Sequence, residues 1–441
     1  MKKPPVFTPE EIARFRTELA ERRAPGAYEP GRWSVSPLNR RTDVVGSLPP
    51  WVRLRDATLR SVETLPGVVA STEAKEAFLR RLVGSGVPEV VTAGLGGRTE
   101  AALKSEVALV KGESPDCRVV CPLMRSPEDI DRAASAGYDA VQVWVQGFGE
   151  TSLIYQAPVY GRAWRGEEWR TAETPRDRAA VLARAARLVS YARERGLDAI
   201  VPLLMVSYAT EESHEESVTL LAAAGATELT LFDGPGAMSP EAYGYLVRQT
   251  RALAPHVEVG LHPHNTYGLA VGCAVAAVRA GAVAVELSVN GYCGGPGNAD
   301  LAATALAFES LYGVQTGIRT ERLTELARAG QELTGYHTAW NHPVTGTHAF
   351  CWGGMDLITQ ETEIDPLLHN CLEPTLVGNT RTVPFTPDSG PYTLVDKLTA
   401  LGIELGHEQV DDLLVRAREL MAREGRLLTD EDLATLAEEV R

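Results

Sequence analysis

Two histidines separated by a single residue, His262 and His264, are the clearest candidates for chemistry in this sequence. They follow the apolar run 257–261, which is typical of a buried strand. Alternate side chains of an extended strand point to the same side, so both imidazoles should project from one strand end. Imidazoles commonly bind divalent metals, and the pair therefore predicts half of a metal site. Because short motifs also arise by chance, an ordinary polar strand end is the alternative interpretation of this motif alone.

A glycine-rich segment supplies two further candidates. Residues 291–298 read Gly-Tyr-Cys-Gly-Gly-Pro-Gly-Asn and directly follow the next apolar run. Asn298 offers an amide as a third metal ligand. Cys293 could be a reacting thiol, or a packed one, since free cysteine is often simply buried.

The elements that must position these residues alternate regularly between residues 52 and 313. Apolar runs rich in Val, Ile and Leu show little alternation, as in parallel strands buried on both faces. The predicted strands span 52–59, 87–93, 118–123, 140–145, 199–206, 228–233, 257–264 and 282–290. The predicted helices between them include 72–85, 98–111, 176–195, 240–254 and 268–280. Several helical stretches end on glycine before the next strand, the usual stop in repeated strand–helix units. These glycines are Gly86, Gly137, Gly196, Gly225 and Gly281.

Eight such units predict an α/β fold of the (β/α)8, or TIM, barrel type, and no nucleotide-binding glycine motif favours an open sheet instead. Active sites of this fold form at the carboxyl ends of the strands. His262 and His264 end the seventh predicted strand, and Asn298 lies just beyond the eighth. Arg60 follows the first strand and Asp233 ends the sixth. The sequence therefore predicts that these polar side chains gather at one rim.

Regions without this rhythm flank the barrel. We expect an N-terminal extension at 1–48 with one helix at 9–22, and the catalytic barrel at 49–315. A linker or lid subdomain at 316–391 is rich in Gly, Pro, Thr and His, and a charged helical subdomain at 392–441 contains at least two helices. Long loop-rich segments beside a barrel often serve as lids or interfaces.

Composition narrows the class of protein. The chain has 441 residues and a net charge of -15, which disfavours nucleic acid and acidic membrane surfaces as partners. No apolar run is long enough to span a bilayer, and the N-terminus has no apolar core of a secretory signal. The six scattered cysteines predict reduced thiols, and together these features indicate a cytoplasmic protein.

Five segments resemble motifs of the homocitrate synthase and isopropylmalate synthase group, within the hydroxymethylglutaryl-CoA lyase-like TIM barrels. The resemblance runs over nearly the whole chain. The segments begin with Asp-Ala-Thr-Leu-Arg at 56, His-Pro-His-Asn-Thr-Tyr-Gly-Leu-Ala at 262, Val-Asn-Gly at 289, Tyr-Gly-Val-Gln-Thr-Gly-Ile at 312 and Asn-His-Pro-Val-Thr-Gly-Thr-His at 341.

The resemblance implies an acyltransferase that joins an acyl-CoA-derived enolate to a 2-oxo acid. A divalent metal (Mg, Mn or Zn) would bind the 2-oxo acid and polarise its carbonyl. By position His262, His264 and Asn298 would be metal ligands, and Arg60 would stabilise negative charge at the reacting carbonyl. Glu63 matches a glutamate of the family and is a candidate catalytic residue, with local hydrogen bonding as the alternative interpretation. The family also pairs its C-terminal regions between subunits, which implies a homodimer.

Several matched positions depart from the family pattern. Ser61 stands where a metal carboxylate is expected. Further departures are Val91, the fifth strand without an acidic residue, Gly234, Thr266, Gly294 and Gly295, and the segment 350–356 in place of a histidine-containing segment. A rim that has lost carboxylates should bind a hard cation less well and should lower the histidine pKa values. We therefore expect either a softer or water-completed metal shell near Cys293 or Ser61, or direct binding of an anionic substrate without metal.

The sequence alone does not decide the roles of Asp233 and His348, and it leaves three functions possible. Asp233 could bind substrate or merely cap the turn before Gly234. His348, with His342, could replace the missing lid histidine and contact substrate. A divergent carbon–carbon bond-forming synthase is the first hypothesis, a lyase or aldolase with Cys293 as acid and base is the second, and a catalytically silent ligand-binding homologue is the third.

Overall fold

A computed structural model describes residues 7–23, 25–62, 64–143 and 178–441 of the chain. The contacts divide the chain into two compact units. One unit is formed by residues 42–338, and the other by residues 1–41 together with 339–441. No helix in the described ranges combines the length and the apolar composition that a bilayer-spanning segment needs.

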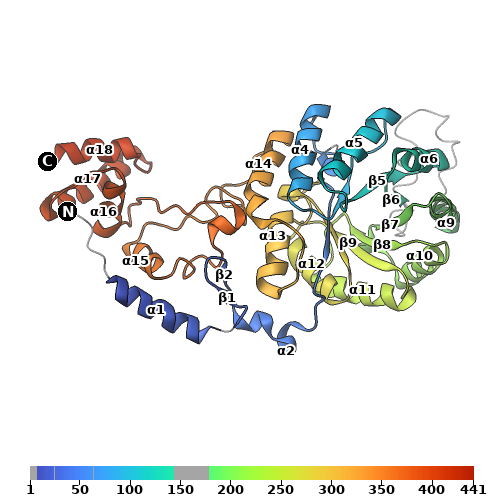
Figure 1. The fold of residues 1–441 in the computed structure, drawn as a ribbon, viewed down its shortest axis with the longest axis horizontal. Helices are drawn as coiled ribbons and strands as arrows, with labels where there is room; N and C mark the ends of the chain where they lie inside the picture. Colours follow the sequence, from blue (N-terminus) through green and yellow to red (C-terminus); the bar gives the residue numbers. More distant parts are fainter. Residues whose placement is uncertain (1–6, 24, 63, 144–177) are drawn as a thin grey trace. The chain divides into compact units, whose positions relative to one another are not determined.

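The larger unit is a closed barrel of eight parallel strands (Figure 1). The strands are β3 (Arg53–Asp56), β4 (Glu89–Val91), β5 (Arg118–Met124), β6 (Ala140–Val143), β7 (Asp198–Leu204), β8 (Glu228–Asp233), β9 (Glu258–Pro263) and β10 (Ala284–Leu287). They follow one another in chain order around the barrel, and β10 closes it by pairing with β3. The predicted TIM barrel is confirmed.

Helices surround the strands in Figure 1. They are α2 (Thr42–Val45), α3 (Thr58–Val62), α4 (Thr72–Gly84), α5 (Glu100–Glu113), α6 (Pro127–Ala136), α9 (Arg178–Glu194), α10 (Glu211–Ala223), α11 (Pro240–Leu253), α12 (Ala270–Arg279), α13 (Leu301–Leu306) and α14 (Leu323–Thr334). Shorter helical turns are η3 (Val206–Tyr208), η4 (Val289–Gly291), η5 (Ala307–Tyr312) and η6 (Thr320–Arg322). Several barrel helices begin after a Ser or Thr whose hydroxyl accepts the backbone hydrogen bond that caps a helix.

The first strand is shorter than the sequence predicts, for a local reason. The Asp56 carboxylate accepts hydrogen bonds from the backbone nitrogen and the hydroxyl of Thr58, at 2.9 and 2.8 Å. The chain therefore turns into helix α3 soon after Asp56, because this side chain satisfies the first N–H group of the helix. Arg60 lies on that short helix and not at the end of a strand.

Buried charges fill part of the barrel interior, which the sequence analysis did not predict. Arg55 is fully buried and contacts Glu89 at 2.9 Å and Glu228 at 2.5 and 2.8 Å. Arg53 adds ion pairs to the same two carboxylates, at 2.9 and 2.8 Å. We call these four residues the interior ionic network. Buried charges are tolerated when they are paired in this way, and both arginines lower the pKa of Glu228 to about 2 despite the opposing effect of its burial.

The smaller unit is mainly helical. Its elements are α1 (Pro9–Arg22), the hairpin β1 (Tyr28–Glu29) and β2 (Trp33–Ser34), η1 (Pro37–Arg40), α15 (Asp356–Ile364), η7 (Pro374–Val377), α16 (Pro391–Ala400), α17 (His407–Glu424) and α18 (Asp430–Glu439). The last three helices pack around their own apolar core, which includes Leu394, Leu413 and Leu433. The predicted helix at 9–22 and the predicted C-terminal helices are confirmed. The sequence predicts four parts with boundaries near residues 48, 315 and 391, whereas contacts between residues group the chain into two units. The four-part division stays a prediction.

Candidate active site

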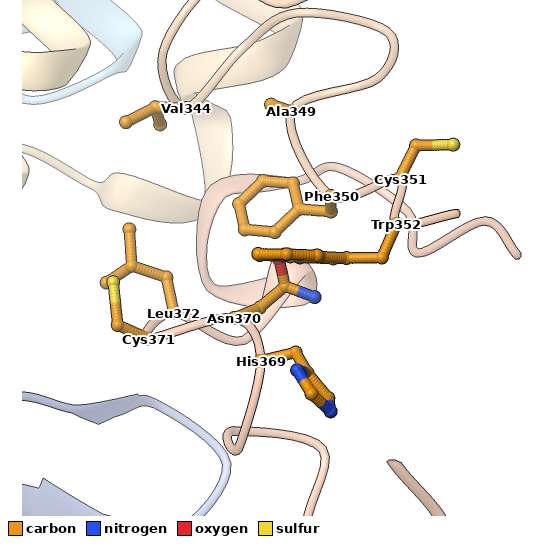
Figure 2. Close-up of a pocket in the computed structure, with 9 residues that line it drawn as sticks. All are labelled: Val344, Ala349, Phe350, Cys351, Trp352, His369, Asn370, Cys371 and Leu372. Carbon is orange, nitrogen blue, oxygen red and sulfur yellow. The ribbon is translucent and has the colours of Figure 1, made fainter. Parts of the chain in front are cut away.

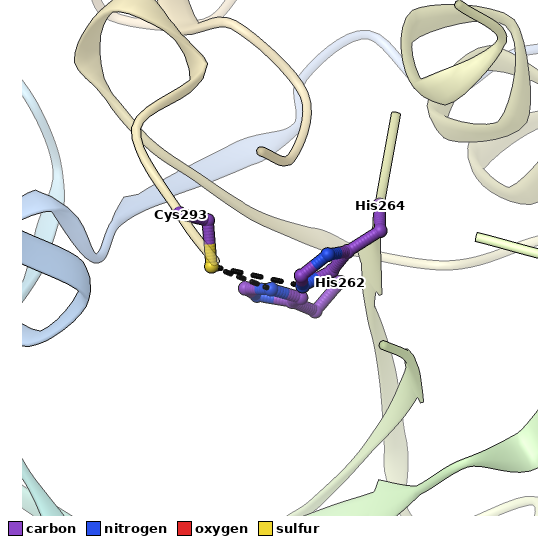
Figure 3. A group of neighbouring side chains, drawn as sticks. All are labelled: His262, His264 and Cys293. Atoms are coloured by element: carbon purple, nitrogen blue, oxygen red, sulfur yellow. Dashed lines mark hydrogen bonds between the residues drawn. The ribbon is translucent and has the colours of Figure 1, made fainter. Parts of the chain in front are cut away.

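Three side chains meet at the carboxyl end of the barrel, and we call them the rim cluster (Figure 3). His262 lies in β9, His264 directly follows the end of that strand, and Cys293 comes from the loop after β10. The Cys293 Sγ lies 4.0 Å from Nε2 of His262 and 3.6 Å from Nε2 of His264. The ligand atoms of all three lie within 4.8 Å of one another. The expectation that both imidazoles project together from one strand end is confirmed.

His262 is held on both sides. Its ring is fully buried and stacks on Phe232 of β8, with centroids 3.7 Å apart and planes inclined by 6°. Its Nδ1 lies 3.0 Å from Oε1 of Glu286 on β10. Burial opposes charge on this ring, but the hydrogen bonds to Cys293 and Glu286 outweigh it and raise the pKa of His262. The carboxylate therefore fixes both the ring orientation and the nitrogen that faces Cys293.

Glu286 also connects the rim cluster to Arg60. Nη2 of Arg60 lies 3.2 Å from Oε1 of Glu286, and its guanidinium lies 5.6 Å from the centroid of Phe232. Gln142 of β6 donates to the other carboxylate oxygen at 2.5 Å. Burial would raise the pKa of Glu286, yet its contacts with His262 and the arginines lower it to about 2. Arg60 and His262 thus share one ionised carboxylate.

The Cys293 thiol differs from the other buried thiols of the barrel. Burial would raise its pKa, but hydrogen bonds to His262 and His264 lower it to about 4. Burial raises the pKa of Cys273 instead, to about 11, and the negative charges of Asp233 and Glu241 act in the same direction. Cys293 is therefore a thiolate at neutral pH when the facing imidazoles carry a proton or bind a metal cation together with the sulfur.

Backbone geometry brings the glycine-rich loop to the histidines. The backbone nitrogen of Asn265 donates to the carbonyl of Gly297 at 2.9 Å, and His264 and Asn298 form an isolated bridge. Gly297 has φ of +85°, and a Cβ there would lie 1.9 Å from the carbonyl oxygen of Gly291. Only glycine fits this turn without a shift of the loop that carries Cys293.

Two buried polar groups near these segments have no hydrogen-bond partner among the described residues. Asn298 accepts from Ser288 through its side-chain oxygen, while its Nδ2 has no partner. Ser61, on helix α3 beside Arg60, has an unpartnered hydroxyl and is fully buried. Such groups are available to a ligand. The role of Asn298 as a metal ligand stays a prediction.

Other predicted site residues lie elsewhere or bind their own loop. The carboxylate of Asp233 accepts from Ser207 Oγ at 2.7 Å and from the backbone nitrogen of Met238 at 2.9 Å. These contacts hold the loop after β8, and substrate binding by Asp233 stays a prediction. Glu63 lies outside the described residues, so its proposed catalytic role is also untested.

His348 belongs to the smaller unit. Its side chain is exposed and packs 5.5 Å from Trp340, centroid to centroid. The same loop region contains a pocket of about 410 Å³ (Figure 2). Its walls include Phe350, Trp352 and His369, and Trp352 Nε1 donates to Asn370 at 2.7 Å. Contact of His348 with substrate stays a prediction.

Glu286 was not among the site residues predicted from the sequence. Because it was overlooked, one expectation about the histidines was wrong. The loss of carboxylates was expected to lower the histidine pKa values, but Glu286 supplies a buried carboxylate and the pKa of His262 is raised. The signal was present in the sequence: a lone acidic residue interrupts the apolar run 282–289. Charged residues are almost never fully buried without a partner, so this position called for one.

Comparisons with known proteins identify the family of the chain. The HMGL-like family profile matches residues 166–329. A protein of Methanopyrus kandleri provisionally named (R)-citramalate synthase is 33% identical over 398 residues, which cover 89% of this chain and 73% of that protein. A second protein of that organism, provisionally named 2-isopropylmalate synthase, is 31% identical and is matched over 85% of this chain and 70% of its own. The 2-isopropylmalate synthase of Methanocaldococcus jannaschii is 27% identical, over 89% of this chain and 72% of that protein.

Solved structures support the fold. The HMG-CoA lyase of Bacillus subtilis superposes with a TM-score of 0.53 at 19% identity, over 65% of this chain and 95% of the lyase. The HMG-CoA lyase of Brucella melitensis gives the same TM-score at 18% identity, over 65% and 100%. At this level of identity the likeness concerns the barrel alone.

Proposed function

Because this chain belongs to the family of the (R)-citramalate and 2-isopropylmalate synthases, we propose that it is an acyltransferase that forms a carbon–carbon bond between an acyl-CoA and a 2-oxo acid. The observation that carries the proposal is the shared carboxylate of Glu286, which holds His262 and Arg60 at one barrel rim. Departures such as Ser61 support a substrate that differs from those of the named relatives.

The donor set fits a divalent metal. Two imidazoles and a thiol present ligand atoms within 4.8 Å of one another, and Asn298 lies on the same loop as the thiol. When bound, a divalent metal would supply Lewis-acid polarisation of the 2-oxo acid carbonyl. His262 and His264 would hold it, with Asn298 as a further candidate ligand.

Arg60 has the charge and the placement to stabilise the reaction. Its guanidinium is 8% exposed and is fixed by Glu286 and by the face of Phe232. A prearranged cation in a site with little water stabilises the negative charge that develops on a carbonyl oxygen under attack. The ion pair with Glu286 keeps the long side chain from losing that position.

A lyase is the second candidate, and Cys293 is the observation that favours it. A thiol with a pKa of about 4 beside two imidazoles could exchange a proton with a cleaved product. That role needs a sulfur free of metal. The same sulfur cannot do both, so the state of Cys293 separates the two functions.

The decisive test is thiol release from acetyl-CoA in the presence of a panel of 2-oxo acids of increasing side-chain size, with Mg²⁺, Mn²⁺ or Zn²⁺ added. We expect release that depends on one class of 2-oxo acid. Arg60→Gln should lower kcat by about 10²–10³-fold, the usual cost of removing a charge-stabilising donor. Arg80→Gln, which changes a surface arginine paired with Glu113, is the matched control and should leave the rate unchanged. Absence of release across the panel would overturn the synthase proposal.

The expected homodimer and the cytoplasmic location stay predictions.

A further inference from the structure

We propose that the rim cluster is a zinc site in which Cys293 is a thiolate ligand together with His262 and His264. A catalytic zinc takes three protein ligands and leaves a fourth position for water or substrate. The inference concerns the ligand set of this chain, and it rests on the proposed function only for the identity of the group that would take the fourth position.

The two sulfur–nitrogen separations within the rim cluster are close to those of a tetrahedral zinc site. Zn–S and Zn–N bonds of about 2.3 and 2.0–2.1 Å at a tetrahedral angle place sulfur and nitrogen about 3.6 Å apart. The observed separations between Cys293 Sγ and the two Nε2 atoms are 3.6 and 4.0 Å. An ordinary hydrogen bond would not need both rings to converge on one sulfur, as they do in Figure 3. All three donor atoms also lie within 4.8 Å of one another.

Glu286 completes the arrangement from behind. Metal-bound histidines commonly donate their other ring nitrogen to a carboxylate, which fixes the tautomer and makes the ligand more basic. Nδ1 of His262 faces Glu286 at 3.0 Å, so its Nε2 presents a lone pair to the sulfur side. The Glu286 carboxylate is itself held by Arg60 and Gln142. This is the support that an oriented metal ligand requires.

The chemistry of the donors selects the metal. Thiolate and imidazole ligands suit zinc, whereas magnesium and manganese prefer carboxylate, carbonyl and water oxygens. Ser61, on helix α3, offers a neutral hydroxyl and no carboxylate. The rim cluster should therefore bind Zn²⁺ or Co²⁺ far more tightly than Mg²⁺.

The test uses the full chain, stripped of metal and titrated with Co²⁺. Co²⁺ should produce a near-ultraviolet thiolate-to-cobalt charge-transfer band, and Zn²⁺ but not Mg²⁺ should abolish it by displacement. Cys293→Ser should lose the band. Cys273→Ser, which changes another buried thiol of the barrel, should keep it. Glu286→Gln should weaken Zn²⁺ binding by about 10–100-fold.

The outcomes separate this inference from the proposed function. A band in the native chain that Cys293→Ser removes supports the site, and circular dichroism of each variant checks that it has folded. A band that survives in Cys293→Ser, no band at all, or displacement by Mg²⁺ at the same concentration as Zn²⁺ would overturn it. Acyl transfer by a protein that fails these metal tests would leave the proposed function standing and assign Cys293 no metal.

Discussion

The barrel interior and its rim both bury charged or ionisable groups, but they balance those groups differently. In the interior ionic network two arginines face two glutamates, and every ion pair is made by the chain itself. In the rim cluster a thiol and two imidazoles face one another, and besides the charge of Arg60 the thiolate is stabilised by a proton on those imidazoles or by a metal. The interior is therefore complete as folded, whereas the rim depends on an exchangeable cation. By this difference the interior ionic network is a structural support, and the rim cluster is a site that can bind a ligand.

Breaking the interior ionic network should have the largest effect on stability. Arg55→Met removes the fully buried cation that Glu89 and Glu228 share, which leaves Glu228 with Arg53 and leaves Glu89 with Arg53 and Arg118. Removing one partner of a buried pair costs about 3–5 kcal/mol. Urea denaturation of the metal-free chain should show this loss in the free energy of unfolding. Cys293→Ser at the rim is the comparison and should change it by about 1 kcal/mol or less, since no fixed ion pair is removed. Equal losses in the two variants would contradict the distinction.

Two buried histidines, His214 and His262, sharpen the comparison because they change the free energy of unfolding with pH in opposite directions. The ring of His214 on α10 contacts the hydroxyl of Thr250, and burial lowers the pKa of His214 to about 4. The unfolded chain therefore takes up this proton first as the pH falls, and the contribution of His214 to stability declines between about pH 6.5 and 4, by up to about 3 kcal/mol. The contribution of His262 to the free energy of unfolding changes with pH in the opposite direction. Its pKa is raised in the folded protein, so it adds stability below about pH 6.5. This added stability is lost as the pH rises through the pKa of the folded state.

The measurement is the free energy of unfolding of the native chain and of His214→Gln at pH 7 and at pH 4.5. We expect the native chain to lose more stability on acidification than the variant does, because glutamine takes up no proton. An identical loss in both proteins would show that His214 does not titrate as its burial indicates.

The smallest of these effects concerns the loop that carries Cys293. Gly297→Ala places a Cβ against the carbonyl oxygen of Gly291 at a positive φ, and such strain costs about 1–3 kcal/mol. The shifted loop should also weaken Zn²⁺ binding. Gly294→Ala is the matched control in the same loop, because nothing lies within 4 Å of an added Cβ there. Calorimetric titration with Zn²⁺ checks both variants, and equal affinities would show that Gly297 does not position the thiol.

The sequence could predict the barrel because local patterns determine it. The strand 228–233 and the helix 9–22 match the observed bounds, and the predicted helix stops Gly86, Gly137, Gly196, Gly225 and Gly281 all have positive φ. Period, capping and glycine placement are properties of neighbouring residues, so they can be recognised without knowledge of tertiary contacts.

The site could be predicted only in part, because its remaining contacts join distant segments. The pairing of His262 with His264 follows from strand geometry, but the approach of Cys293 depends on a loop bent by Gly297. Glu286 lies 24 residues from His262 and 226 from Arg60, and only closure of the barrel brings the three together. The interior ionic network was missed for the same reason, although Arg55 lies within a predicted strand and Glu228 begins one.

The most direct test of the account is X-ray absorption of the zinc-loaded full chain. We predict a first coordination shell with one sulfur at about 2.3 Å and two imidazole nitrogens at about 2.0–2.1 Å, and loss of the sulfur contribution in Cys293→Ser. A shell made only of nitrogen and oxygen in the native protein, or a sulfur contribution that persists in the variant, would contradict the claim that the rim cluster is a cysteine-containing metal site.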